Sequence, residues 1–282
     1  MRTLLRRAVD GLLFLFLTAW LPNVWGGEEE AVVATVAGEP IVLGEFLLHL
    51  NARRAGVYAH FQEKSRSEDI GLFWQTKYDG VTPADFLKAK TLQDLKAIKV
   101  QQCAARQAGI VDEPGYKAFR RRWEAENGRR AEAPHTGEII YGPKHLSEWV
   151  FYNEEMARLV RRLKSDAVEK TLRVNEDEVR QYYERHKNER YRAPEGGFVS
   201  YEFIQPAVRR DCVDEKYRTM VEELVRQAEV IVNEKIYEEI DPAAEGVPEK
   251  QSPANEPFRM TRIPPERTTG DGVNCSRMCN GN

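Results

Sequence analysis

The sequence lacks the short motifs that mark the commonest catalytic and cofactor sites. It contains no GxSxG nucleophile motif, no P-loop, no GxGxxG dinucleotide motif and no HExxH zinc motif. Its histidines are few and scattered, and none combines with cysteine at zinc spacing: His49, His60, His135, His145 and His186. We therefore assign no catalytic residue, no metal ligand and no cofactor, and the sequence singles out no binding residue.

Cysteine is scarce as well, and no CxxC pair occurs. The four cysteines are Cys103, Cys212, Cys275 and Cys279. In an exported protein they could form disulfides, with three possible pairings, or remain free thiols. Cys275 and Cys279 are close enough in the chain to close a small loop.

An excess of positive charge is also missing. The chain carries 42 basic and 45 acidic residues, which argues against broad nucleic-acid binding. Short basic clusters could bind phosphates or an anionic cell-wall polymer, but acidic neighbours favour a solvated helix face. These clusters are Arg120-Arg121-Arg122, Arg129-Arg130 and Arg161-Arg162.

The N-terminus has the order of features expected of a secretory signal peptide. Arg2, Arg6 and Arg7 precede an apolar run over residues 11–21, which Pro22 breaks. Because the run is too short for a standing transmembrane helix, we expect cleavage after Gly26, with an uncleaved anchor as the alternative. The sequence therefore predicts a secreted or envelope-associated protein with no stable membrane span after cleavage.

The remaining chain reads mainly as helices. Two β-rich runs around Gly38 predict a hairpin, and a helix is expected to begin near Gly44. Thr82 before Pro83 predicts a helix start, with Gly109 as the stop. Apolar residues at alternating spacings of three and four predict a long helix with a coiled-coil-like seam: Trp149, Tyr152, Met156, Leu159 and Leu163.

Several further boundaries follow from capping and turn residues. Asp112 is a candidate cap for a helix, residues 128–142 a connection, and Asn175 the cap of a helix with a near capping box. Residues 198–204 predict a strand, residues 216–227 a helix and residues 230–232 a short strand. Six prolines and four glycines after Ile240 predict a disordered tail over residues 241–282.

Three segments in order resemble the SurA/PrsA-type extracytoplasmic foldases. The first is Val33-Ala34-Thr35-Val36-Ala37-Gly38-Glu39-Pro40-Ile41 followed by Glu45-Phe46, where Ala37 replaces the usual Asn. The second is the helix with Leu92, Leu95, Ile98, Lys99, Ala105 and Gly109-Ile110. The third is VNEDEVRQYYERHKNERY at residues 174–191, which is similar to the family's helix leading into its isomerase domain.

The resemblance implies a mainly α fold with four segments. These are the signal peptide (1–26), a SurA-N-like helical chaperone domain with a short N-terminal β-hairpin (27–192), a small α/β remnant of a parvulin-type isomerase (193–240) and the tail (241–282). The family's His-Ile-Leu motif is missing, with Glu202 at the place of the His. The resemblance thus favours binding of unfolded or partly folded exported polypeptides; the alternatives are an active peptidyl-prolyl isomerase, in which Tyr201 and Glu202 would matter, and a cell-wall-associated interaction protein.

Overall fold

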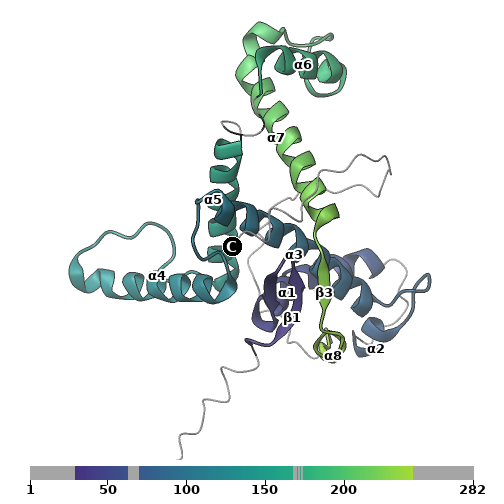
Figure 1. Ribbon diagram of the computed structural model, residues 1–282, viewed down its shortest axis with the longest axis vertical. Helices are drawn as coiled ribbons and strands as arrows, with labels where there is room; N and C mark the ends of the chain where they lie inside the picture. The colour runs from purple at the N-terminus through teal and green to yellow at the C-terminus, as the bar shows by residue number, and fades with distance from the viewer. Residues whose placement is uncertain (1–28, 63–69, 168–169, 171, 173, 244–282) are drawn as a thin grey trace, which may run out of the picture.

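The computed structural model describes residues 29–62, 70–167, 170, 172 and 174–243. The predicted signal peptide, nearly all of the predicted tail, Cys275 and Cys279 lie outside these residues. Within them the fold is mainly helical with a short three-stranded antiparallel sheet, which confirms the predicted fold class. Figure 1 shows a compact base from which two helical arms extend.

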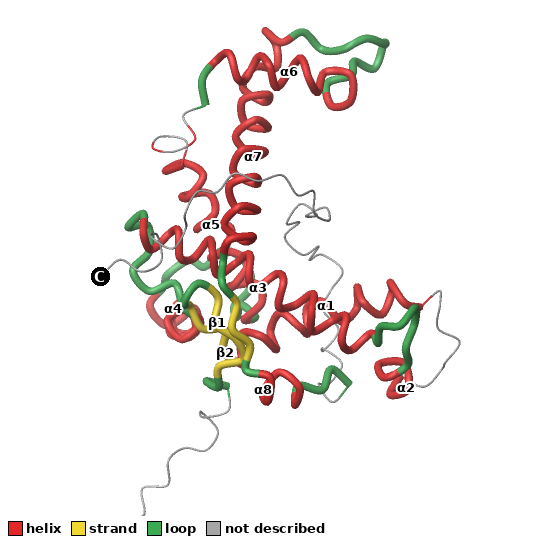
Figure 2. Tube along the Cα trace, turned by 45° about the vertical axis from the view of Figure 1, so that its right-hand side comes forward, coloured by secondary structure: helices red, strands yellow, loops and turns green. Residues whose placement is uncertain are grey.

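The sheet joins the two ends of the described chain. Its strand order is β2-β1-β3, with bounds β1 Val32–Val36, β2 Glu39–Val42 and β3 Val230–Val232. The β1–β2 turn uses Ala37 and Gly38, both with positive φ (49° and 82°), as a two-residue hairpin of type I′ requires. Ala34 of β1 lies opposite Ile41 on one side and Val232 on the other, and Figure 2 shows the strands side by side.

Helices from both halves of the chain cover this sheet. They are α1 Leu43–Gln62, α3 Pro83–Gln107 and α8 Glu234–Glu239, while α2 Ile70–Gln75 packs against α3. The start of α3 is fixed as predicted, because the Thr82 hydroxyl accepts a hydrogen bond from the Asp85 N–H at 3.0 Å. The core of the base consists of fully buried apolar side chains, among them Val33, Phe46, Leu50, Leu87 and Leu95.

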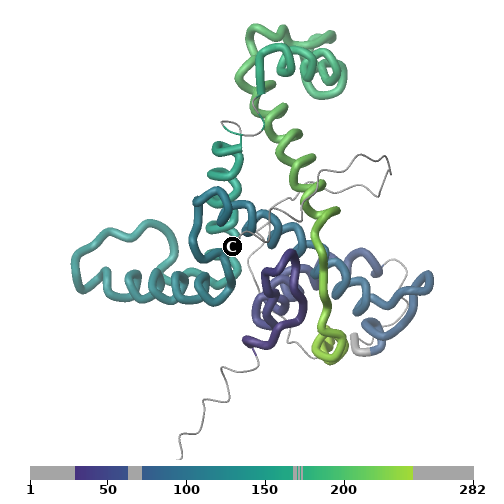
Figure 3. Tube along the Cα trace, in the orientation of Figure 1, coloured from purple at the N-terminus to yellow at the C-terminus, as the bar shows by residue number. Residues whose placement is uncertain are grey.

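Two helix pairs form the arms that extend from the base (Figures 1 and 3). Their helices are α4 Tyr116–Thr136 and α5 Glu148–Ala167, then α6 Glu176–Arg190 and α7 Tyr201–Gln227. The capping box at Asn175 and Glu178 begins α6, as predicted. The far end of the second arm has its own core, which we call the distal cluster: Val174, Val179, Tyr182, Tyr183, Tyr191, Tyr201, Val208 and Cys212.

The predicted limits of the fourth helix are wrong at both ends. The N-cap of α4 is Gly115 and not Asp112, because Pro114 disfavours helical backbone at the residue before it. The helix also continues through Gly128 to Thr136, inside the predicted connection, and ends where Gly137 takes a φ of 74°. Ion pairs of Arg129 and Arg130 with Glu126 brace this stretch against the weak helix propensity of glycine.

The predicted strand over residues 198–204 is also wrong. Phe198 makes only an isolated bridge with Arg192, and α7 begins at Tyr201 and includes the helix predicted over residues 216–227. Tyr201, Val208 and Cys212 all face the distal cluster, so packing against α6 overrides the β propensity of the segment. The short strand at residues 230–232 is confirmed as β3, and it pairs with β1. The division at residue 193 stays a prediction, although both of its sides contribute to one sheet.

Candidate functional site

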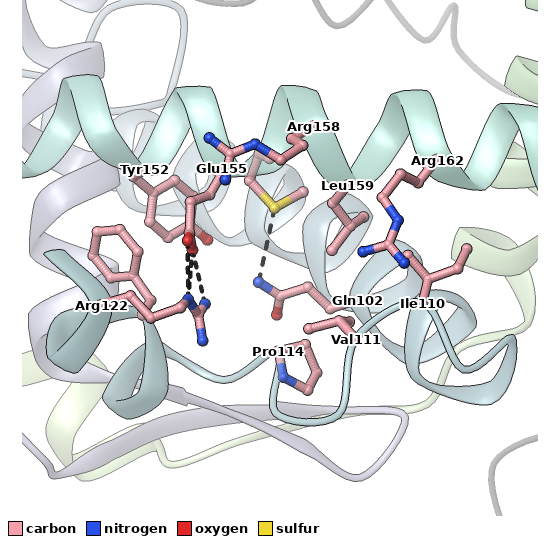
Figure 4. Close-up of a pocket in the computed structure, with 12 residues that line it drawn as sticks. Gln102, Ile110, Val111, Pro114, Arg122, Tyr152, Glu155, Arg158, Leu159 and Arg162 are labelled. Atoms are coloured by element: carbon pink, nitrogen blue, oxygen red, sulfur yellow. Dashed lines mark hydrogen bonds and ion pairs between the residues drawn. The ribbon is translucent and has the colours of Figure 1, made fainter. Parts of the chain in front are cut away.

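Two adjoining hollows in the described surface run along α5. One cavity of about 180 Å³ lies between the end of α3, the α3–α4 connection and α5 (Figure 4). A second hollow of about 490 Å³ lies between α4 and α5, and it shares Arg122, Glu155 and Arg158 with the first. We call the two together the α5 groove. Its floor is largely apolar in the first cavity: Ile110, Val111, Pro114, Phe119, Met156 and Leu159.

The seam predicted for the long helix supplies one wall of the α5 groove. Tyr152 and Leu163 are buried as core residues, whereas Met156 and Leu159 between them are only partly covered. A seam at spacings of three and four places these side chains on one helix face, but it cannot show which of them stay accessible. The α3–α4 connection, with Ile110 and Val111, carried no periodic signal, so its part in the groove was missed.

An ion pair crosses the groove and ties its two helices together. The Arg122 guanidinium of α4 donates to the Glu155 carboxylate of α5 at 2.9 and 3.1 Å from Nε and at 2.7 Å from Nη2. Such forked pairing fixes geometry better than a single contact does. Figure 4 shows this pairing between α4 and α5 at the first cavity, and both residues also line the second hollow.

Most arginines of the basic clusters identified in the sequence also form ion pairs with acidic side chains. Arg120 lies near Glu29 and Glu148, Arg121 pairs with Glu113, and the pairs of Arg129 and Arg130 involve Glu126. The short bonds from Arg129 and Arg130 lower the pKa of Glu126 to about 2. In contrast, within the described residues no acidic side chain pairs with Arg158 or Arg162, which line the first cavity.

Behind the groove, a buried polar cluster holds α5 on the base. Tyr152 donates to Glu45 of α1 at 2.9 Å, and Lys99 of α3 lies 2.8 Å from the same carboxylate. His49 packs edge-on against Tyr152, with ring centroids 4.8 Å apart, and burial together with Lys99 and Arg53 lowers its pKa to about 3. The histidine is therefore neutral at ordinary pH. The wall of the groove that contains Tyr152 thus rests on a rigid support.

The residues considered for isomerase chemistry lie elsewhere, at the start of α7. Tyr201 is a buried residue whose hydroxyl donates to the exposed Glu176. The exposed Glu202 accepts from the Ser200 hydroxyl, which lowers the pKa of Glu202. Both are thus engaged in local structure, and isomerase activity stays an untested alternative. Across the described ranges, no three His, Cys, Asp or Glu side chains gather closely enough to hold a metal ion. No helix in the same ranges combines the length and apolar content needed to cross a membrane.

Comparisons with known proteins find a distant relative. The chain is 23% identical over 142 residues to a protein of Bifidobacterium longum subsp. longum named as a chaperone for lacto-N-biosidase. The match covers 50% of this chain and 51% of the relative, so the chain spans about half the length of the curated relative it matches. No family model and no solved structure matches, so membership of the SurA/PrsA family is not confirmed. The chain is thus similar, at low identity and over half its length, to a protein named as a chaperone.

Proposed function

We propose that this protein is an extracytoplasmic chaperone that holds non-native polypeptide in the α5 groove. The observation that carries the proposal is an apolar floor left open beside a helix that Phe151 and Tyr152 anchor in the core. Exposed apolar surface in a defined hollow is what transient binding of an unfolded chain requires. The name of the distant relative and the predicted signal peptide support the same function.

The size of the groove fits a short extended segment and not a folded partner. Cavities of about 180 and 490 Å³ accept a few side chains at a time. Weak, local contacts of this kind allow release without ATP, because little surface is buried at any moment. The Tyr141 side chain, which is 84% exposed after α4, offers a further contact point.

The proposal is tested by light scattering from a chemically denatured client diluted into buffer with the mature protein. We expect the wild-type protein to slow aggregation of several unrelated clients. A Val111→Gln/Leu159→Gln variant should lose most of this effect, since it places polar groups on the floor of the groove. The free energy of unfolding of each variant, measured in urea, separates lost binding from lost structure.

Phe203→Ser is the matched control, because it removes a larger exposed apolar side chain far from the groove, at the start of α7. We expect this variant to slow aggregation to the same extent as the wild type. If Phe203→Ser abolished the effect while the groove variant kept it, the client surface would lie on the second arm. Absence of any effect across all clients would overturn the general chaperone function, and an effect on one client alone would point to a chaperone dedicated to one exported partner.

A further inference from the structure

We infer that the α5 groove selects polypeptide segments in which carboxylate side chains stand beside apolar ones. This inference rests on the proposed chaperone function and adds to it the chemistry of the preferred segment. The feature behind it is an arrangement of two arginines around Leu159: Arg158 precedes it directly, and Arg162 lies one turn farther along α5.

Arg158 and Arg162 both line the first cavity, together with the residues of its apolar floor. Residues four apart on a helix are neighbours on one face, so Arg158 and Arg162 can act on the same bound segment. Figure 4 shows both on α5, with Arg162 extending toward Ile110 across the cavity. Both side chains are exposed, and within the described chain neither has an acidic partner.

The other charges along the groove are largely balanced. Glu155 accepts three hydrogen bonds from Arg122, and Glu126 pairs with Arg129 and Arg130. The second hollow also contains Glu154, so the excess of arginine over glutamate is smaller there than in the first cavity. The surplus is therefore larger in the first cavity, next to its apolar floor, where Arg122, Arg158 and Arg162 face Glu155 alone.

The chemistry of arginine then defines the ligand. A guanidinium presents its N–H groups in a planar fork that matches a carboxylate, and it is hydrated more weakly than an ammonium group. A segment that places leucine or phenylalanine on Ile110, Val111 and Leu159 would bring a nearby Asp or Glu side chain within reach of Arg158 and Arg162. Charge-assisted hydrogen bonds would then add to apolar contact.

Three fluorescein-labelled peptides of equal length test the inference by anisotropy with the mature protein. They share a pair of leucines and differ at two adjacent positions, which are Glu, Gln or Lys. We expect the Glu peptide to bind most tightly and the Lys peptide most weakly, with the preference shrinking as salt screens the charges. The Arg158→Gln/Arg162→Gln variant should bind the Glu peptide about tenfold more weakly, because two exposed charge-assisted hydrogen bonds are lost. Its affinity for the Gln peptide should fall much less, because no charge-assisted bond is lost there.

Arg161→Gln is the matched control, because Arg161 is also an exposed arginine of α5 but does not line the groove. It should bind the Glu peptide as the wild type does. Equal affinity for the Glu and Gln peptides, or an equal loss in the Arg161→Gln variant, would overturn the inference. If the wild type still slowed client aggregation in that case, the chaperone function would stand without the carboxylate preference; if it did not, the chaperone function itself would fail.

Discussion

Glu45 of α1 and Lys99 of α3 are both fully buried, and their Oε2 and Nζ atoms lie 2.8 Å apart. Tyr152 of α5 donates to the other carboxylate oxygen at 2.9 Å. Three helices thus meet at one ion pair beneath the groove. A buried ion pair contributes little net stability compared with apolar packing. Removing one of its charges is nevertheless strongly destabilising, because the other charge is then buried without a counter-charge.

Glu45→Gln should lower the free energy of unfolding by about 3–5 kcal/mol, because it leaves the Lys99 ammonium buried without a counter-charge. Urea denaturation measures the change. Lys99→Met in the Glu45→Gln background should recover part of the loss, since the unpaired charge is removed as well. Additive losses in this double-mutant cycle would show that the two charges are not coupled.

His49 should make stability depend on pH below neutrality. Its pKa is about 3 in the folded protein and near 6.5 when unfolded, so the unfolded state binds more protons between these values. The contribution of the neutral histidine is full above pH 6.5 and is lost as the pH falls. For this one group, we expect the free energy of unfolding to drop by roughly 1.5 kcal/mol between pH 6.5 and pH 5.

His49→Phe provides the control for this pH dependence. It keeps an aromatic ring against Trp149 and Tyr152 but removes the titrating group. Urea midpoints of the variant should change little between pH 6.5 and pH 5. A variant with the same slope as the wild type would assign the pH dependence to other groups.

Tyr237→Ala tests whether the C-terminal end of the described chain secures the base. The Tyr237 ring packs on Phe46 at a centroid distance of 5.9 Å, and the Lys88 ammonium lies 5.3 Å from the ring centroid. Because the ring is only partly buried, we expect a loss of about 2 kcal/mol, below the cost of a fully buried aromatic residue. Lys235→Ala, an exposed change on the same helix α8, should cost far less; equal losses would mean that α8 is held by its backbone alone.

Cys212 should react slowly with alkylating reagents in the native protein. Its thiol is buried in the distal cluster, and burial raises its pKa, so little reactive thiolate is present at neutral pH. Mass spectrometry after brief iodoacetamide treatment should find Cys212 unmodified until denaturant is added. Rapid native labelling of this residue would show that the distal cluster opens readily.

The sequence allowed three pairings of the four cysteines, and the structure reduces the number of possible pairings. Cys103 and Cys212 are both buried, and no disulfide joins them. This removes one pairing and leaves the state of Cys275 and Cys279 as a prediction. Counting alkylated cysteines in denaturant, with and without reductant, decides between a closed loop and free thiols.

The elements with strong local signals were predictable from the sequence. Thr82 with Pro83, the capping box at Asn175 and the Gly38 hairpin each set backbone geometry through nearby atoms. The seam along α5 was equally clear, since its spacing repeats over several turns. One wall of the candidate site therefore follows from periodicity alone.

The failures occurred where distant contacts decide the local structure. The start of α7 has β-prone residues, yet packing of Tyr201 and Val208 against α6 makes it helical. Gly128 reads as a helix breaker, but Asn127 beside it hydrogen-bonds both the carbonyl and the N–H of Leu146. The sequence also could not predict that the α3–α4 connection faces α5 across the groove, because that arrangement depends on tertiary packing.

The place of β3 beside β1 imposes an order on the folding of the chain itself. β1 is among the first described segments to be synthesised, but its second neighbour is made only after nearly all the described chain has followed. Contacts so distant in sequence form slowly, and an unpaired strand edge invites association in the meantime. A protein proposed to bind non-native polypeptides is thus itself prone to association until β3, the last strand of the described chain, has paired with β1.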